Sequence, residues 1–167
     1  MHPEWNTLTE AFDADIAVVV LENDAVFNKY IHPICVTTPN TNIAAITTGI
    51  VVGYGRSEDQ TKFHENIPKA LISPITNNRE CFSVNRDLAK ISSGRTFCGG
   101  PGKGVGVCNG DSGSGLFVTN GSLYYLRGVV SSSLKGGPYE CNVDTYSVFT
   151  DATKYINFIK SIPTNRF

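Results

Sequence analysis

The sequence predicts an all-β domain of antiparallel strands that ends in one helix. Short apolar runs alternate with turn residues along most of the 167 residues, a pattern typical of antiparallel strands. Asn120-Gly121 lies between two such runs, and both residue types tolerate the positive φ of a tight hairpin turn. Apolar residues recur at helical spacing only in the tail.

The expected elements follow the chain in order. The aliphatic run of residues 16–21 is predicted to be a buried strand. The next predicted strands are residues 46–54, 69–75, 116–118, 123–131 and 146–150. Residues 151–162 are predicted to be a helix because their apolar residues fall on one face, with Asp151 or Thr153 as its N-cap.

The composition of the chain excludes several classes of function. A hydrophobic fraction of 41% and a charged fraction of 17% describe one ordinary globular domain. The net charge of −1 provides no long-range attraction to nucleic acid or anionic lipid, so neither is expected as a partner. Residues 16–21 are too few to span a bilayer. The first residues lack the basic and apolar regions of a signal peptide.

The cysteines indicate disulfides and an oxidising, extracellular compartment. There are five, at positions Cys35, Cys81, Cys98, Cys108 and Cys141, so one must pair outside the chain or stay free. Together with His2, His32 and His64 they show no metal-ligand spacing, and we expect no metal or cofactor. A secreted-type cysteine set without a leader suggests that upstream sequence is missing.

The run Gly110-Asp111-Ser112-Gly113-Ser114-Gly115 is the strongest candidate for chemistry. A serine hydroxyl becomes a nucleophile when a base takes its proton and backbone amides hold the oxyanion. Neighbouring glycines let bare backbone approach the substrate carbonyl. The alternative is a simple surface loop of turn residues. The spacing of a P-loop, of a GxGxxG fingerprint and of a GxSxG elbow is not met.

This run resembles the CxGDSGG box of trypsin- and chymotrypsin-like serine proteases, with Cys108 as its first residue. Further segments are similar to the family's motifs in the family's order: Asp15-Ile16-Ala17, His32-Pro33-Ile34-Cys35-Val36, Gly53-Tyr54-Gly55, Phe97-Cys98-Gly99-Gly100, Gly128-Val129-Val130-Ser131 and Val148-Phe149-Thr150-Asp151. The resemblance covers nearly the whole chain. It departs from the family at Ser114, Gly115 and Ser132, where Gly, Pro and Trp are usual.

The resemblance implies two six-stranded antiparallel barrels with the active site between them. The chain would be the C-terminal part of one such domain. Residues 1–35 would supply the end of an incomplete first barrel and the connector, residues 36–150 a complete second barrel, and residues 151–163 the terminal helix. It also implies disulfides Cys81–Cys98 and Cys108–Cys141, each stabilising by roughly 3 kcal/mol, and a Cys35 bonded to a missing N-terminal segment.

By the same resemblance Ser112 is the nucleophile of a serine endopeptidase, with the amides of Gly110 and Ser112 as its oxyanion hole. Asp15 orients a histidine base; Asp13 is the competing carboxylate, and Asp15 is preferred because it directly precedes Ile16. Protein or peptide would be the substrate.

The resemblance assigns three further functions around the nucleophile. Asp111 would pair with a new N-terminal amine after zymogen cleavage. Gly106 would form the base of the specificity pocket, with Ser133 and Ser147 as its walls. This pocket would be uncharged and would favour apolar side chains; the alternative for Gly106 is a turn glycine.

No residue of the sequence matches the family's catalytic histidine. Only His2 precedes Asp15, and its surroundings resemble a surface segment; His32 and His64 come in the wrong order. Two hypotheses follow: a secreted endopeptidase of which this is a truncated part, or a non-catalytic homologue that acts as a binding or regulatory module.

Asn120-Gly121-Ser122 is a glycosylation sequon on a predicted hairpin tip. We assign it no catalytic role.

Overall fold

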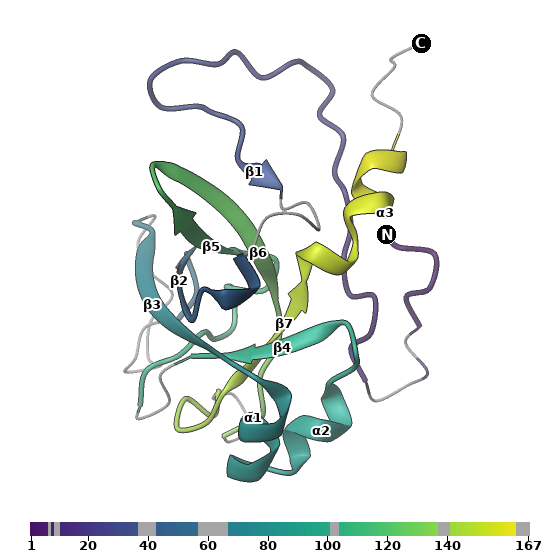
Figure 1. Cartoon of the computed structure of the whole chain (residues 1–167), viewed down its shortest axis with the longest axis vertical. Helices are drawn as coiled ribbons and strands as arrows, with labels where there is room; N and C mark the ends of the chain where they lie inside the picture. Colours follow the sequence, from purple (N-terminus) through teal and green to yellow (C-terminus); the bar gives the residue numbers. More distant parts are fainter. Residues whose placement is uncertain are drawn as a thin grey trace.

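A closed antiparallel barrel dominates the part of the chain that this computed structural model describes, which is residues 1–6, 8, 11–36, 43–56, 67–100, 104–136 and 141–162 (Figure 1). The strands there are β1 Cys35–Val36, β2 Thr48–Gly53, β3 Lys69–Thr76, β4 Thr96–Gly99, β5 Gly115–Asn120, β6 Leu123–Ser132 and β7 Ser147–Asp151. Their order is β1-β6-β5-β2-β3-β4-β7, and β7 pairs back with β6. Strands β2 to β7 thus form the ring, and β1 runs parallel to β6 outside it.

The predicted trypsin-like, all-β fold class is confirmed, and so are most of the predicted strands. Residues 46–54, 69–75, 123–131 and 146–150 correspond to β2, β3, β6 and β7, and residues 116–118 lie inside β5. The predicted hairpin joins β5 to β6. Its turn uses Gly121 at φ 63°, whereas Asn120 is the last residue of β5.

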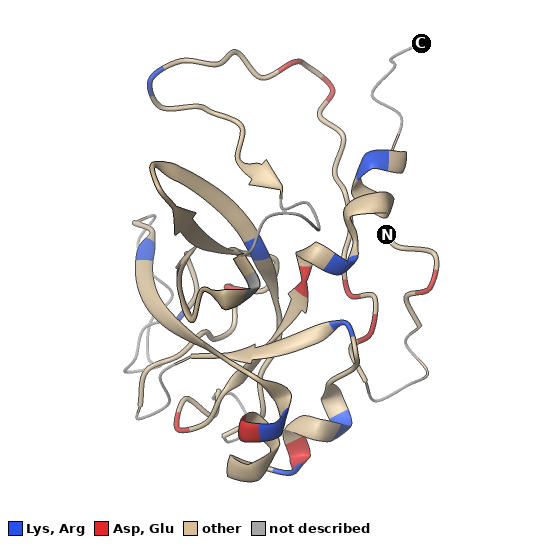
Figure 2. Cartoon of the chain, in the orientation of Figure 1, with Lys and Arg blue, Asp and Glu red and all other residues tan. Residues whose placement is uncertain are grey.

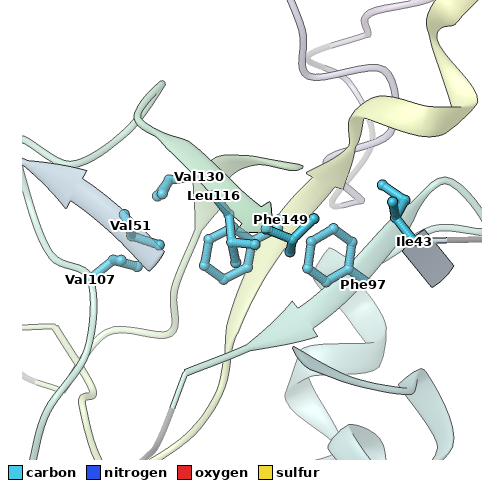
Figure 3. Close-up of a cluster of buried hydrophobic side chains, with 8 residues drawn as sticks. Ile43, Val51, Phe97, Val107, Leu116, Val130 and Phe149 are labelled. Carbon is cyan, nitrogen blue, oxygen red and sulfur yellow. The ribbon is translucent and has the colours of Figure 1, made fainter. Parts of the chain in front are cut away.

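The core lies inside the ring, because alternate residues of each strand point inward. In β2 the buried positions are Gly49, Val51 and Gly53. Gly49 has no room for a side chain, since a Cβ there would lie 2.4 Å from the Leu116 side chain. Figure 3 shows the buried cluster, which consists of Ile43, Val51, Phe97, Val107, Leu116, Val118, Val130 and Phe149. The Phe149 ring stacks on the Phe97 ring, with ring centroids 5.4 Å apart.

The prediction that only the tail is helical was wrong. Two short helices, α1 Asn78–Val84 and α2 Asp87–Ile91, lie between β3 and β4, and a 3₁₀ turn spans Ile43–Ala45. Asn77 caps α1 by accepting a hydrogen bond from the Glu80 amide. Both helices pack on the barrel through Cys81 and Leu88, which are fully buried. They are too short to show a clear 3.6-residue pattern.

The tail contains two helical segments where one was predicted. A 3₁₀ turn, η2, spans Ala152–Lys154 and helix α3 spans Ile156–Ser161. Asp151 ends β7 and accepts from the Thr153 amide, so it caps η2 as one of the two predicted caps. Tyr155 lies between the segments with non-helical backbone angles and is buried. The non-helical backbone at Tyr155 therefore divides the predicted helix in two.

The predicted buried strand at residues 16–21 was also wrong. These residues form no strand, and Val19, Val20 and Leu21 are 81%, 59% and 58% exposed. A strand needs a neighbour for its backbone hydrogen bonds. Residues 16–21 have no strand partner in the described structure: β2 to β7 pair with one another in a closed ring, and the strand that pairs with β6 from outside is β1. The chain instead runs over the outside of the barrel before it reaches β1 (Figure 1).

Among the described residues, no helix is both long and apolar enough to cross a membrane.

Candidate active site

Asp15 and Ser112 line one cavity of about 480 Å³. The nucleophile candidate comes from the loop before β5 and the carboxylate from the N-terminal segment, so residues far apart in the sequence meet at the surface of the barrel. The other lining residues are Met1, Trp5, Ile16, Ala17, Val19, Gly113, Val129, Val130 and Ser131. A cavity of this size accommodates a side chain together with part of a peptide.

Three contacts hold Asp15 at the cavity. The hydroxyl of Ser131 on β6 donates to Asp15 Oδ2 at 2.7 Å. The hydroxyl of Thr150 on β7 donates to the Asp15 carbonyl at 2.8 Å. The preceding amide, on fully buried Ala14, donates to the Tyr155 hydroxyl at 3.0 Å. Ala14 has φ 56°, a conformation that costs a residue with a Cβ about 1 kcal/mol or more, and these contacts hold it there.

The competing carboxylate, Asp13, lies in a different environment. It accepts hydrogen bonds from the Ser93 hydroxyl and from two guanidinium nitrogens of Arg95. The Arg95 hydrogen bond lowers the pKa of Asp13 to about 2, although burial acts in the opposite direction. Asp13 is not among the residues that line the cavity. Of the two carboxylates, Asp15 is therefore the one that shares a cavity with Ser112.

The Ser112 loop is fixed on both sides. Cys108 is bonded to Cys141, and the Gly113 amide donates to the Val130 carbonyl on β6 at 2.9 Å. Gly110 and Gly113 have φ of 97° and 85°, values that favour glycine. The amides of Gly110 and Ser112 donate no hydrogen bond to any described residue. Both residues are exposed, so neither amide is used by the described part of the fold.

Asp111 points away from this cavity. Its carboxylate accepts from the Gly55 amide at 2.8 Å and from the Cys108 amide at 3.0 Å. Gly55 is required by this approach, because a Cβ there would lie 2.3 Å from the carboxyl carbon. Asp111 also lines a second cavity of about 70 Å³, together with Arg56 and Gly106. The loop thus presents Ser112 on one side and Asp111 on the other.

The three predicted pocket residues, Gly106, Ser133 and Ser147, do not line the Ser112 cavity. Gly106 borders the smaller cavity, and a Cβ on it would lie 3.4 Å from Val143. Ser147 is the buried first residue of β7 and pairs with Gly99. Ser133 directly follows the β6 residue that pairs with Val148. Ser133 and Ser147 thus both adjoin the pairing of Ser132 with Val148.

The disulfides join Cys81 to Cys98 and Cys108 to Cys141, the pairing that the family resemblance implies. The first fastens α1 to β4, and the second fastens the Ser112 loop to the start of the segment before β7. Cys35 in β1 is a half-buried free cysteine.

No described histidine lines the Ser112 cavity. The His2 ring packs edge-on against Phe158 and Tyr155, with centroids 4.6 Å and 5.2 Å apart, and its Nδ1 accepts from the Glu4 amide. His32 is exposed. His64 lies outside the described residues.

Sequence reasoning did not identify the residues that hold Asp15. Ser131 lies in the predicted strand motif, but nothing in that motif marks its hydroxyl as a carboxylate partner. The sequence pattern assigns Thr150 to a predicted strand. It assigns Tyr155 to the apolar face of the predicted helix. Their separations of 135 and 141 residues from their partners explain why no local pattern identifies them.

A profile of the Trypsin family matches residues 1–159. The chain is 30% identical over 191 aligned residues to Serine protease gd of Drosophila melanogaster. It is 28% identical over 163 residues to Phenoloxidase-activating factor 3 of Holotrichia diomphalia and 29% over 162 residues to Chymotrypsin-like elastase family member 1 of Bos taurus. These alignments cover 95%, 95% and 96% of this chain but only 36%, 44% and 59% of the three relatives. The barrel, the Ser112 loop and these matches agree: the chain belongs to the trypsin-like serine protease family.

Proposed function

We propose that this chain is part of a serine-type endopeptidase that hydrolyses peptide bonds by a Ser-His-Asp mechanism. The histidine would come from a segment outside these 167 residues. The observation that carries the proposal is the shared cavity of Asp15 and Ser112. We call the chain joined to this upstream segment the full-length protein.

The contacts of Asp15 support its role as the group that orients the imidazole. Its Oδ2 accepts from Ser131, while Oδ1 accepts no hydrogen bond from the described residues. Oδ1 is therefore open to the Nδ1–H of an imidazole placed in the cavity. In this role Asp15 orients the imidazole and stabilises the imidazolium that forms.

Ser112 would act as the nucleophile. Its Oγ attacks the peptide carbonyl carbon while its proton passes to the imidazole Nε2. The negative charge that develops on the carbonyl oxygen is held by the Gly110 and Ser112 amides, the two donors without a described acceptor. The imidazolium then protonates the leaving amine, and water hydrolyses the acyl-enzyme.

Activation and specificity follow the same assignment. Asp111 already accepts two backbone hydrogen bonds. It would gain an ion pair with a new N-terminal amine that enters the smaller cavity after zymogen cleavage. With Gly106 at the base and Ser133 and Ser147 as walls, the specificity pocket would be uncharged and would accept apolar side chains. Its substrate would be a protein or peptide.

The disulfides support an extracellular location, where such bonds persist. We propose that Cys35 forms an intermolecular or inter-segment disulfide with the upstream part of the full-length protein. Its half-buried position in β1, at the margin of the barrel, makes it accessible to such a partner.

The alternative is a non-catalytic homologue that acts as a binding or regulatory module. One observation favours it: no described histidine lines the cavity of Asp15 and Ser112. Without a base, the rate would fall by several orders of magnitude even with an intact oxyanion hole.

Labelling with a phosphonate that reacts with activated serines separates the two. The full-length protein, after activation, is expected to be labelled at Ser112, and Ser112→Ala and Asp15→Asn are expected to lose the label. Ser114→Ala, two residues away, is the matched control and should retain it. A folded, activated protein that takes up no label would support the homologue instead.

A further inference from the structure

The turn between β5 and β6 carries the one Asn-x-Ser/Thr sequence of the chain, Asn120-Gly121-Ser122. All three residues are exposed. A Cβ added to Gly121 would meet no described atom within 4 Å, so the space around the turn is open. An enzyme that modifies Asn120 therefore finds no obstruction from the rest of the described fold.

The surface around this turn is apolar and uncharged. Asn120 pairs with Leu123, and Thr119 pairs with Tyr124; Leu123 and Tyr124 are 51% and 56% exposed. Residues 115–126 contain no charged side chain, and Figure 2 shows this hairpin without a blue or red segment around its turn. Exposed apolar side chains on a β-hairpin favour association between chains, and a bulky solubilising group beside them opposes it.

The turn is remote from the proposed catalytic cavity. Val129, the first residue of β6 that lines the cavity, follows Leu123 by six residues. At roughly 3.3 Å per residue this places the turn about 20 Å away along the strand. A large group on Asn120 therefore leaves the entrance to Ser112 open.

We propose that Asn120 is an N-glycosylation site and that its glycan covers Leu123, the residue that pairs with it directly. A lipid-pyrophosphate-linked oligosaccharide is the donor. A bond forms between the sugar C1 and Asn120 Nδ2, the C1–O bond to the pyrophosphate breaks, and the amide nitrogen loses one proton. The Ser122 hydroxyl completes the acceptor sequence. The inference rests on the extracellular location proposed above and is independent of any catalytic role.

The test is translation of the chain behind a cleavable signal peptide in the presence of eukaryotic microsomes. Chains protected from added protease are expected to migrate as one larger species, which peptide-N-glycosidase F returns to the unmodified mobility. Glycosidase digestion in ¹⁸O-water should convert Asn120 alone into labelled aspartate. Asn120→Gln and Ser122→Ala should both lose the larger species. Asn157→Gln, at another exposed asparagine, should retain it.

Protease-protected chains that keep the unmodified mobility would overturn the proposal, as would a larger species that survives Asn120→Gln. Transfer takes place on the nascent chain, so a variant that folds poorly still reports on the site. Ser112→Ala should be modified like the wild type, which separates this result from any failure of the proposed catalysis.

Discussion

The Tyr155 hydroxyl supports the residue next to the candidate catalytic carboxylate, and Tyr155→Phe removes that hydroxyl alone. Tyr155 is 2% exposed, and its oxygen accepts from the Ala14 amide at 3.0 Å. Burial raises the pKa of Tyr155 above its ordinary value of 10.0, so the hydroxyl is neutral at pH 7. The substitution keeps the aromatic ring and therefore tests the hydrogen bond.

The expected loss follows from the burial of both partners. Ala14 is 0% exposed, so its amide loses its acceptor in a place that water does not reach. Such a loss costs about 1–3 kcal/mol. In a domain of this size each kcal/mol lowers the Tm by roughly 2–4 °C. A central cost of about 2 kcal/mol therefore predicts a decrease of about 4–8 °C.

The assay is thermal unfolding of the full-length protein at pH 7, followed by circular dichroism. Tyr124→Phe is the control because Tyr124 is 56% exposed. This substitution should change the free energy of unfolding by no more than about 0.5 kcal/mol. Equal Tm values for Tyr155→Phe and Tyr124→Phe would refute the reasoning that this hydroxyl holds the Ala14 backbone.

Further predictions concern the N-terminal segment and β6. Because Arg95 lowers the pKa of Asp13 to about 2, the stabilisation by the ionised carboxylate is complete above its ordinary pKa of 3.8 and is lost as the pH falls through 2. The free energies of unfolding of wild type and Asp13→Asn, measured in urea, should therefore differ at pH 7 by about 1 kcal/mol after allowance for exposure and converge below pH 2; a constant gap contradicts this. Ser131→Ala should slow phosphonate labelling on the order of tenfold, from a loss of about 1.5 kcal/mol at Asp15, whereas Ser132→Ala should not; equal rates would remove Ser131 from the site. The 167 residues produced alone should aggregate, because the apolar segment before β1 is exposed; a monomer with a cooperative melt would argue against a missing partner segment.

Five of the six strands of the ring are predicted from the sequence, because each combines an apolar run with turn residues at its ends; β4, a four-residue strand, was not predicted. The Asn-Gly turn between β5 and β6 is the clearest example. The short helices before β4 could not be found this way. Their positions depend on the Asn77 cap and on the Cys81 disulfide, so tertiary contacts determine them more than an apolar period does.

Residues 16–21 demonstrate the opposite error. Their aliphatic composition favours a strand, yet a strand also needs a neighbouring strand to pair with, and composition does not report whether one is present. At the site, the resemblance of the Ser112 loop and of Asp15-Ile16-Ala17 to the family's motifs predicts that Ser112 and Asp15 meet, and both line the cavity. The hydroxyl of Ser131 that meets Asp15 could not be predicted, since the two residues are 116 positions apart.

Strand β6 connects more of this molecule than any other described element. It contacts β1, β5 and β7, accepts a hydrogen bond from the Gly113 amide of the nucleophile loop, and carries at its penultimate residue, Ser131, the hydroxyl that holds Asp15. Motion that detaches this strand would open the ring and disperse the polar groups of the cavity in the same event. Loss of function on heating should therefore coincide with global unfolding, with no folded but incompetent species between them.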